Sequence, residues 1–224
     1  MTDDFIFYRR SLPHFQPENG CFFITFRLAN TISHAILIEM VEERRIEEQV
    51  IQQDFTGDAY LNEIYRLNKK YFGRYDSWLD RCDHGPAWLK DEHVANVVIE
   101  QIQHLDKFRY DLLACCIMPN HVHLLIAAAN FSQISTSNLD GMTRMYPLTD
   151  TLRLLKGSTA RYCNQILGRS GAFWHHESYD HNVRNSQELE RIIRYILANP
   201  VKAGLVQDWK AWKYSYVALE LGEW

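Results

Sequence analysis

The chain lacks several features that mark secreted or membrane proteins. No apolar run among its 224 residues approaches the roughly 18 residues that a membrane-spanning helix needs. Its first residues, MTDDFIFYRRSLPH, are acidic where a signal peptide is basic and then apolar. The five cysteines include no C-x-x-C pair. We therefore expect a cytoplasmic protein with reduced thiols and no membrane partner.

The chain also lacks the excess of positive charge that many nucleic-acid-binding proteins carry. Its formal net charge is −4 at pH 7. The charge is unevenly spread, however, because residues 144–213 hold 11 Lys or Arg and only 6 Asp or Glu. A local basic face of this kind can bind phosphates even when the whole protein is acidic.

The pattern of apolar residues predicts an α+β fold in one domain, since internal repeats are absent and the chain is short for two domains. Strands are predicted at 21–28, 109–118 and 121–129, the last two as a hairpin, and helices at 32–52, 91–105, 148–167 and 186–199. Residues 54–88 are predicted to form short helices joined by loops, and 168–185 to be largely loop or short strand. This order favours an antiparallel sheet with helices on one face.

The stretch MPNHVHLLI, residues 118–126, carries His121 and His123 two positions apart on a mostly apolar strand. Side chains alternate between the faces of a strand, so both imidazoles point the same way. Such a pair is a metal site, a hydrogen-bonded core pair or two solvent-facing side chains. A metal site would need a third ligand from elsewhere in the fold.

The predicted last helix carries a tyrosine outside its apolar stripe. Tyr195 lies roughly 130° from the centre of that stripe, on a ridge shared with Arg191 and Asn199. Two interpretations are open at this point: Tyr195 covers the edge of the helix, or it is a catalytic side chain. The stripe itself consists of Leu189, Ile192, Ile193, Ile196 and Leu197.

These motifs together resemble the REP-associated tyrosine transposases, bacterial members of the His-hydrophobe-His nuclease superfamily. The resemblance rests on MPNHVHLLI, SYDHNVRN (178–185) and RYILANPVKAGLV (194–206), and it extends over most of the chain. It implies a ferredoxin-like βαββαβ antiparallel sheet with helices on one face and an added C-terminal helix that carries the nucleophile. Residues 1–224 would form a single catalytic domain, with variable insertions at 54–88 and 131–147, which carry none of the family motifs.

The resemblance also implies roles for individual residues. His121 and His123 match the paired metal ligands, and Tyr195 matches the nucleophile because it lies four residues before the Asn-Pro of NPVKAGLV. Asn199 matches the third, amide ligand. Mixed nitrogen and oxygen ligands suit Mg²⁺ or Mn²⁺. The implied reaction cleaves single-stranded or hairpin DNA of the REP type, through a 5′-phosphotyrosine intermediate.

DNA contacts are expected from the basic and aromatic side chains of residues 144–213. The candidate phosphate ligands are Arg153, Lys156, Arg161, Arg184, Arg191 and Arg194. The candidates for stacking on unpaired bases are Phe173, Trp174 and Tyr179, with Trp174 equally suited to the core. A second histidine cluster, His175, His176 and His181, is expected to be structural or to face DNA.

Two other functions are compatible with the sequence. A histidine-triad enzyme acting on small phosphate esters would need a third alternating histidine, and this chain has Leu125 there. A module that binds DNA or RNA without catalysis is the second alternative. The sequence leaves the choice between a monomer and a tyrosine-exchanging homodimer open.

Overall fold

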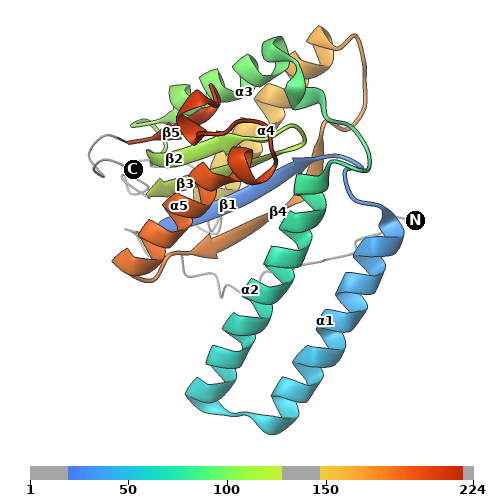
Figure 1. The fold of residues 1–224 in the computed structure, drawn as a ribbon, viewed down its shortest axis with the longest axis vertical. Helices are drawn as coiled ribbons and strands as arrows, with labels where there is room; N and C mark the ends of the chain where they lie inside the picture. Colours follow the sequence, from blue (N-terminus) through green and yellow to red (C-terminus); the bar gives the residue numbers. More distant parts are fainter. Residues whose placement is uncertain (1–19, 128–146, 219–224) are drawn as a thin grey trace, which may run out of the picture.

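A five-stranded antiparallel sheet forms the centre of the protein (Figure 1). The computed structural model describes residues 20–127 and 147–218. The strands are β1 Cys21–Leu28, β2 Asp111–Ile117, β3 His121–Ala127, β4 Trp174–Asn182 and β5 Ser215–Val217, in the order β4-β1-β3-β2-β5. All four pairings are antiparallel. The predicted α+β class with an antiparallel sheet is therefore confirmed.

The described residues form five α-helices. They are α1 His34–Asp54, α2 Gly57–Arg81, α3 Glu92–Leu105, α4 Pro147–Ile166 and α5 Ser186–Lys202, with short 3-10 helices η1 Trp88–Lys90 and η3 Trp209–Ala211. Asp91 accepts hydrogen bonds from the backbone N–H groups of His93 and Val94 at the start of α3. Asn185 caps α5 by accepting from the N–H of Glu188. Both helices begin within one residue of their predicted starts at 91 and 186.

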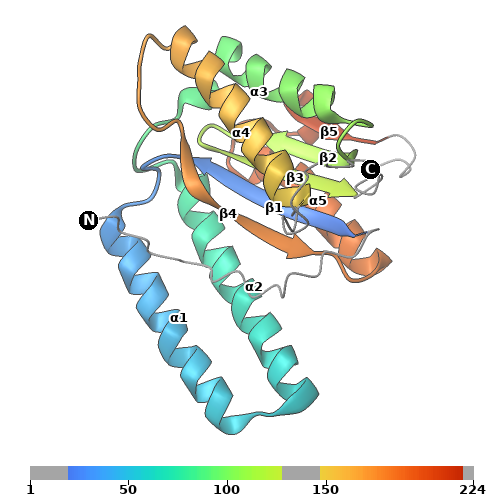
Figure 2. The same cartoon turned by 180° about the vertical axis from the view of Figure 1, so that it is seen from behind.

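The helices cover both faces of the sheet. On one face, alternate residues of β1 such as Phe22, Ile24 and Phe26 pack into one core with α3 and α4. Figure 2 shows these two helices in front of the sheet. On the other face, Phe23 and Leu125 pack against α5, which lies in front of the sheet in Figure 1. The prediction of helices on one face is thus correct for α3 and α4, and α5 adds a layer on the other.

Three segments differ from the sequence-based expectation. Residues 54–88 do not form short helices: α2 is a single helix of 25 residues, which pairs with α1 in a long hairpin (Figure 1). Residues spaced one turn apart, Leu67, Tyr71, Tyr75 and Leu79, bury one side of α2, which explains its continuity. The segment 168–185 contains the nine-residue strand β4, and the Trp-rich tail adds β5 at the opposite edge.

The chain runs through Pro200 without ending α5. The helix extends to Lys202, and the N–H of Ala203 still bonds to the carbonyl of Asn199. Tyr195 and Asn199 therefore keep their one-turn spacing.

None of the helices within the described ranges has the length and apolar character to cross a bilayer. Of the proposed insertion at 131–147, all but the last residue lies outside the described ranges.

Candidate metal and nucleophile site

The two histidines of β3 lie side by side on the face of the sheet that α5 covers. Their Nε2 atoms are 3.0 Å apart, and both side chains are fully buried. The Oδ1 of Asn120 accepts a hydrogen bond from Nδ1 of His121 at 2.7 Å, while Thr25 Oγ1 pairs with Nδ1 of His123 at 2.8 Å. These partners occupy the Nδ1 atoms and orient both Nε2 atoms into one site, as in many metal centres.

Asn120 explains why the Pro-Asn turn precedes the histidines. Its amide Nδ2 donates to the carbonyl of Leu79 in α2, at 2.9 Å. Its carbonyl oxygen is thereby directed at His121. A single buried asparagine thus fixes both the orientation of the first imidazole and the approach of α2 to the sheet.

Burial keeps both imidazoles neutral. It lowers the pKa of His121 well below its ordinary value, with a further contribution from His123. It also lowers the pKa of His123 to about 3. A neutral imidazole is the form that binds a metal ion.

Two carboxylates of α2 complete the polar site. Asp76 Oδ1 lies 3.4 Å from Nε2 of His123, and Asp80 Oδ1 lies 3.9 Å from Nε2 of His121. Desolvation raises the pKa of Asp76 to about 6, and desolvation together with the charge of Asp76 raises the pKa of Asp80 to about 7. Asp76 is buried and Asp80 half-buried, and the positive charge of Lys202 offsets their negative charge in part. A bound cation would offset it further.

The donor set fits a divalent ion. One ligand atom each from Asp76, His121 and His123 lie within 4.8 Å of one another. Within the described residues, Oδ1 of Asp76, Oδ1 of Asp80 and Oδ1 of Asn199 accept no hydrogen bond although they are buried. Buried oxygens of this kind need a partner. The histidine pair and Asp76 could therefore bind a metal ion.

Tyr195 of α5 reaches the same site. Its hydroxyl donates a hydrogen bond to Oδ2 of Asp76, and its ring centroid is 5.5 Å from that of His123. Burial and the neighbouring Asp76 carboxylate raise the pKa of Tyr195. Asn199, one turn further on, is fully buried and donates from Nδ2 to the Tyr195 carbonyl at 2.9 Å. Its role as a metal ligand stays a prediction.

The sequence analysis missed Asp76 and Asp80, because it assigned no chemistry to residues 54–88. A signal was present: two carboxylates four positions apart share one face of a helix. That face is the apolar one, since Tyr75 and Leu79 are buried beside them. A carboxylate on a buried helix face is rare without a partner.

Comparison with known proteins finds similarity in sequence and in overall structure. No protein-family model matches the chain. A 115-residue stretch, half of the chain, is 29% identical to the "Putative REP-associated tyrosine transposase" of Haemophilus influenzae and covers 62% of that protein. Over this stretch, the chain is similar in sequence to a protein described as a REP-associated tyrosine transposase.

Two solved structures are similar in outline. One is the structure of a REP-associated tyrosine transposase bound to a REP hairpin, with 15% identity, a TM-score of 0.44, and coverage of 93% of this chain and 80% of that one. The other is a transposase-like crystal structure from Deinococcus radiodurans, with 12% identity, a TM-score of 0.34, and coverage of 85% and 97%. Both TM-scores are below 0.5, so only the similarity in sequence is used below.

The candidate DNA ligands of α4 occupy different environments. Arg153 and Arg161 are exposed, and Arg153 pairs with Asp150 at 3.2 Å. Lys156 differs from the expectation, because its ammonium group donates to the carbonyls of His175 and His176 and to the hydroxyl of Ser178. An ammonium group has three hydrogens. Lys156 therefore fastens β4 to α4, and its role as a phosphate ligand stays a prediction.

The three aromatic candidates for base stacking also differ in their exposure to solvent. Phe173 and Trp174 are 1% and 6% exposed, and the indole of Trp174 donates to Thr159 at 2.9 Å. The Phe173 ring stacks on Trp88 with centroids 5.5 Å apart. Neither ring offers a face to a base, so the stacking prediction is wrong for these two residues. Tyr179 is half-buried and stacks on Phe72 of α2.

The remaining arginines surround Tyr195 and the start of α5. Arg184, Arg191 and Arg194 are all exposed. The Arg184 guanidinium lies 3.9 Å from the centroid of the Tyr65 ring, and Arg191 pairs with Glu188 at 3.2 Å. In the second histidine cluster, His181 pairs with Glu188 at 3.2 Å and is structural, whereas His176 is exposed. His175 is half-buried.

Proposed function

We propose that this chain is a metal-dependent tyrosine transposase that cleaves and rejoins single-stranded DNA at hairpins of the REP type. The observation that carries the proposal is the hydrogen bond from the Tyr195 hydroxyl to Asp76, whose other oxygen faces His123 at 3.4 Å. A hydroxyl nucleophile and a set of metal ligands thus meet in one buried site. This combination is what phosphodiester transfer needs.

The metal ligands in this proposal are His121, His123 and Asp76, with the unpartnered Oδ1 of Asn199 as a further one. Nitrogen and carboxylate or amide oxygen ligands are compatible with Mg²⁺ or Mn²⁺. When bound, a divalent ion offsets the charge of the scissile phosphate and polarises it. Asn120 and Thr25 hold the two imidazoles in the orientation that binding requires.

The covalent step is performed by Tyr195. Its oxygen attacks phosphorus and forms the new P–O bond, while the bond to the 3′-oxygen of the neighbouring nucleotide breaks. The hydroxyl proton passes to Oδ2 of Asp76, which already accepts it in a hydrogen bond, and the leaving 3′-oxygen takes up a proton. The 5′-phosphate stays on Tyr195. Attack by a 3′-hydroxyl reverses the step and joins DNA, since one phosphate ester replaces another.

In this proposal, exposed arginines on both faces of the sheet hold the DNA strand. Arg184, Arg191 and Arg194 lie just before or on α5, on the face that carries Tyr195, and Arg153 and Arg161 lie on α4, on the opposite face. Contacts from arginine to phosphate give affinity without sequence preference. Recognition of a hairpin with an unpaired flank is attributed to these contacts together with Tyr179.

The test is covalent capture. Wild-type protein is incubated with end-labelled single-stranded hairpin DNA and Mn²⁺, then separated under denaturing conditions. We expect a labelled protein–DNA adduct that EDTA prevents and that Tyr195→Phe does not form. An adduct formed by the Phe variant would show that another residue, with Tyr179 the first to test, is the nucleophile.

The two alternatives make different predictions in the same experiment. A histidine-triad enzyme would act on small phosphate esters and leave the DNA intact, but Leu125 is buried in the apolar core where its third histidine would stand. A binding module without catalysis would retard the DNA and never form an adduct.

A further inference from the structure

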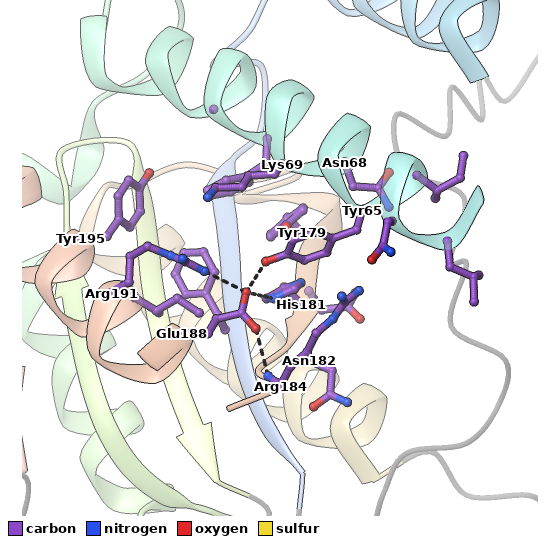
Figure 3. Close-up of a pocket in the computed structure, with 18 of the residues that line it drawn as sticks. Tyr65, Asn68, Lys69, Tyr179, His181, Asn182, Arg184, Glu188, Arg191 and Tyr195 are labelled. Carbon is purple, nitrogen blue, oxygen red and sulfur yellow. Dashed lines mark hydrogen bonds and ion pairs between the residues drawn. The ribbon is translucent and has the colours of Figure 1, made fainter. Parts of the chain in front are cut away.

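A cavity of about 800 Å³ lies beside Tyr195, between α2, β4 and α5. Figure 3 shows its polar side chains converging from these three elements around Glu188. Tyr195 belongs both to the wall of this cavity and to the metal and nucleophile site. A ligand in the part of the cavity nearest to α5 can therefore contact Tyr195.

The floor of the cavity is aromatic. Phe72 and Tyr179 stack with centroids 4.1 Å apart and an interplanar angle of 27°, and Phe23 meets the edge of Phe72 at 5.5 Å. Phe23 also stacks on His123, with centroids 5.7 Å apart, and contacts the Tyr195 ring. Aromatic rings thus form a continuous series of contacts from the cavity to His123. Flat rings at the floor of a cavity favour a flat ligand.

One wall is built around the Glu188 carboxylate. It is 4% exposed and accepts hydrogen bonds from the hydroxyl of Tyr65 and, at 2.9 Å, from the N–H of Arg184. His181 and Arg191 each lie 3.2 Å from the same carboxylate. These contacts hold the wall in one arrangement, and a preformed wall reduces the entropy lost on binding.

The charges of the lining balance. Three cationic side chains, Lys69, Arg184 and Arg191, face three carboxylates, Asp58, Asp180 and Glu188. A phosphate would meet no net positive charge in the cavity. An uncharged ring with hydrogen-bonding edges fits better, because the amides of Asn68 and Asn182 also line the cavity.

We propose that this cavity takes up an unpaired DNA base next to the phosphate that Tyr195 attacks. The proposal rests on the function proposed above and extends it. The base stacks on the outer face of the Tyr179–Phe72 pair, and amide and arginine side chains contact its edge. Its own sugar-phosphate then leads directly to Tyr195. Seating the base would hold the neighbouring phosphate in register with the nucleophile.

The experiment uses a series of hairpin oligonucleotides, each with one abasic nucleotide at a successive position on either side of the cleaved bond. Affinity is measured in EDTA by fluorescence anisotropy, and adduct formation is measured in Mn²⁺. Stacking of one base typically contributes a roughly 5- to 150-fold gain in affinity. We expect a loss in this range at one position adjoining the cleaved bond.

Gly73 supplies a matched pair of variants. It lines the cavity from α2, and a Cβ added there meets no atom within 4 Å. Gly73→Ala adds little volume and favours the helix, whereas Gly73→Trp adds a large ring that competes with a base for space in the cavity. We expect Gly73→Ala to retain the dependence on that base. Gly73→Trp should bind intact DNA as weakly as the wild type binds the abasic oligonucleotide, with no further loss on the abasic one.

The outcomes separate this proposal from the proposed function. If intact DNA gives no adduct, the transposase assignment fails, while the anisotropy series still tests the cavity. If an adduct forms equally well with every abasic oligonucleotide, and affinities stay within twofold, the base site is refuted and the transposase assignment stands. Should Gly73→Trp fail to fold, the wild-type series alone decides.

Discussion

Tyr195→Phe should reduce stability as well as abolish cleavage. The hydroxyl of Tyr195 is the hydrogen-bond donor to Asp76 Oδ2, and Oδ1 of the same carboxylate accepts no hydrogen bond within the described residues. Asp76 is 3% exposed. Because its pKa is raised only to about 6 by desolvation, it is mostly ionised at pH 7.5. The Phe variant would leave a buried carboxylate without a donor.

The expected loss can be estimated from the chemistry of that group. Leaving one buried acceptor unsatisfied costs about 1–3 kcal/mol of unfolding free energy. For a protein of this length, each 1 kcal/mol corresponds to roughly 2–4 °C in Tm. Tyr195→Phe should therefore melt roughly 2–12 °C below the wild type. Tyr162→Phe is the matched control: that side chain is 55% exposed on α4, and its loss should be within about 0.5 kcal/mol.

Thermal unfolding in EDTA at pH 7.5 measures these differences for Tyr195→Phe, Asp76→Ala and the double variant. In the Asp76→Ala background, removing the Tyr195 hydroxyl leaves no buried carboxylate without a hydrogen-bond donor. The two substitutions should therefore couple by about 1–3 kcal/mol in a double-mutant cycle. A Tyr195→Phe Tm equal to that of Tyr162→Phe, or an equal loss in the Asp76→Ala background, would refute the reasoning.

Three further expectations follow from named contacts. His123→Ala should abolish Mn²⁺-dependent cleavage while exposed His176→Ala retains it; cleavage undiminished in EDTA would eliminate the metal-assisted mechanism. Burial raises the pKa of Glu188, but its hydrogen bonds outweigh burial and lower the pKa below 4.5. The loss of unfolding free energy caused by Glu188→Gln should therefore be constant above about pH 5.5 and should vanish as pH falls below 4.5. Urea titrations of both proteins at several pH values measure this difference. Arg161→Ala should flatten the slope of log K against log salt by about 0.7, whereas Lys156→Ala should lower Tm because it releases β4 from α4.

Much of the fold was predictable because it depends on local patterns. The alternation of apolar residues in 21–28 corresponds to β1 residue for residue, and the caps Asp91 and Asn185 start α3 and α5. The long α2 was not predicted. Its buried positions are two leucines, two tyrosines and an aspartate among charged residues. This weak apolar signal becomes a core only when α1 packs against it.

Burial of the aromatic residues also depended on distant contacts. Phe173 and Trp174 lie in the polar stretch GRSGAFWHH, where an exposed stacking role is a reasonable expectation. In the structure, Trp88 and Thr159, remote in sequence, enclose them. Tyr179, five residues after Trp174, instead turns toward the other face, because the register of β4 against β1 pairs it with Thr25.

The sequence by itself determined which side chains could act: two histidines must share a face because they are two apart on a strand, and Tyr195 and Asn199 must share a ridge because they are four apart on a helix. Only the tertiary structure decided that these two elements face each other, since α5 could have packed on either side of the sheet. It also decided the third group, because Asp76 reaches His123 from a helix 47 positions away in the chain. No local sequence pattern predicts this contact between Asp76 and His123. It forms because α2 packs over the buried face of the sheet, where the hydrogen bond from Asn120 to the Leu79 carbonyl holds it.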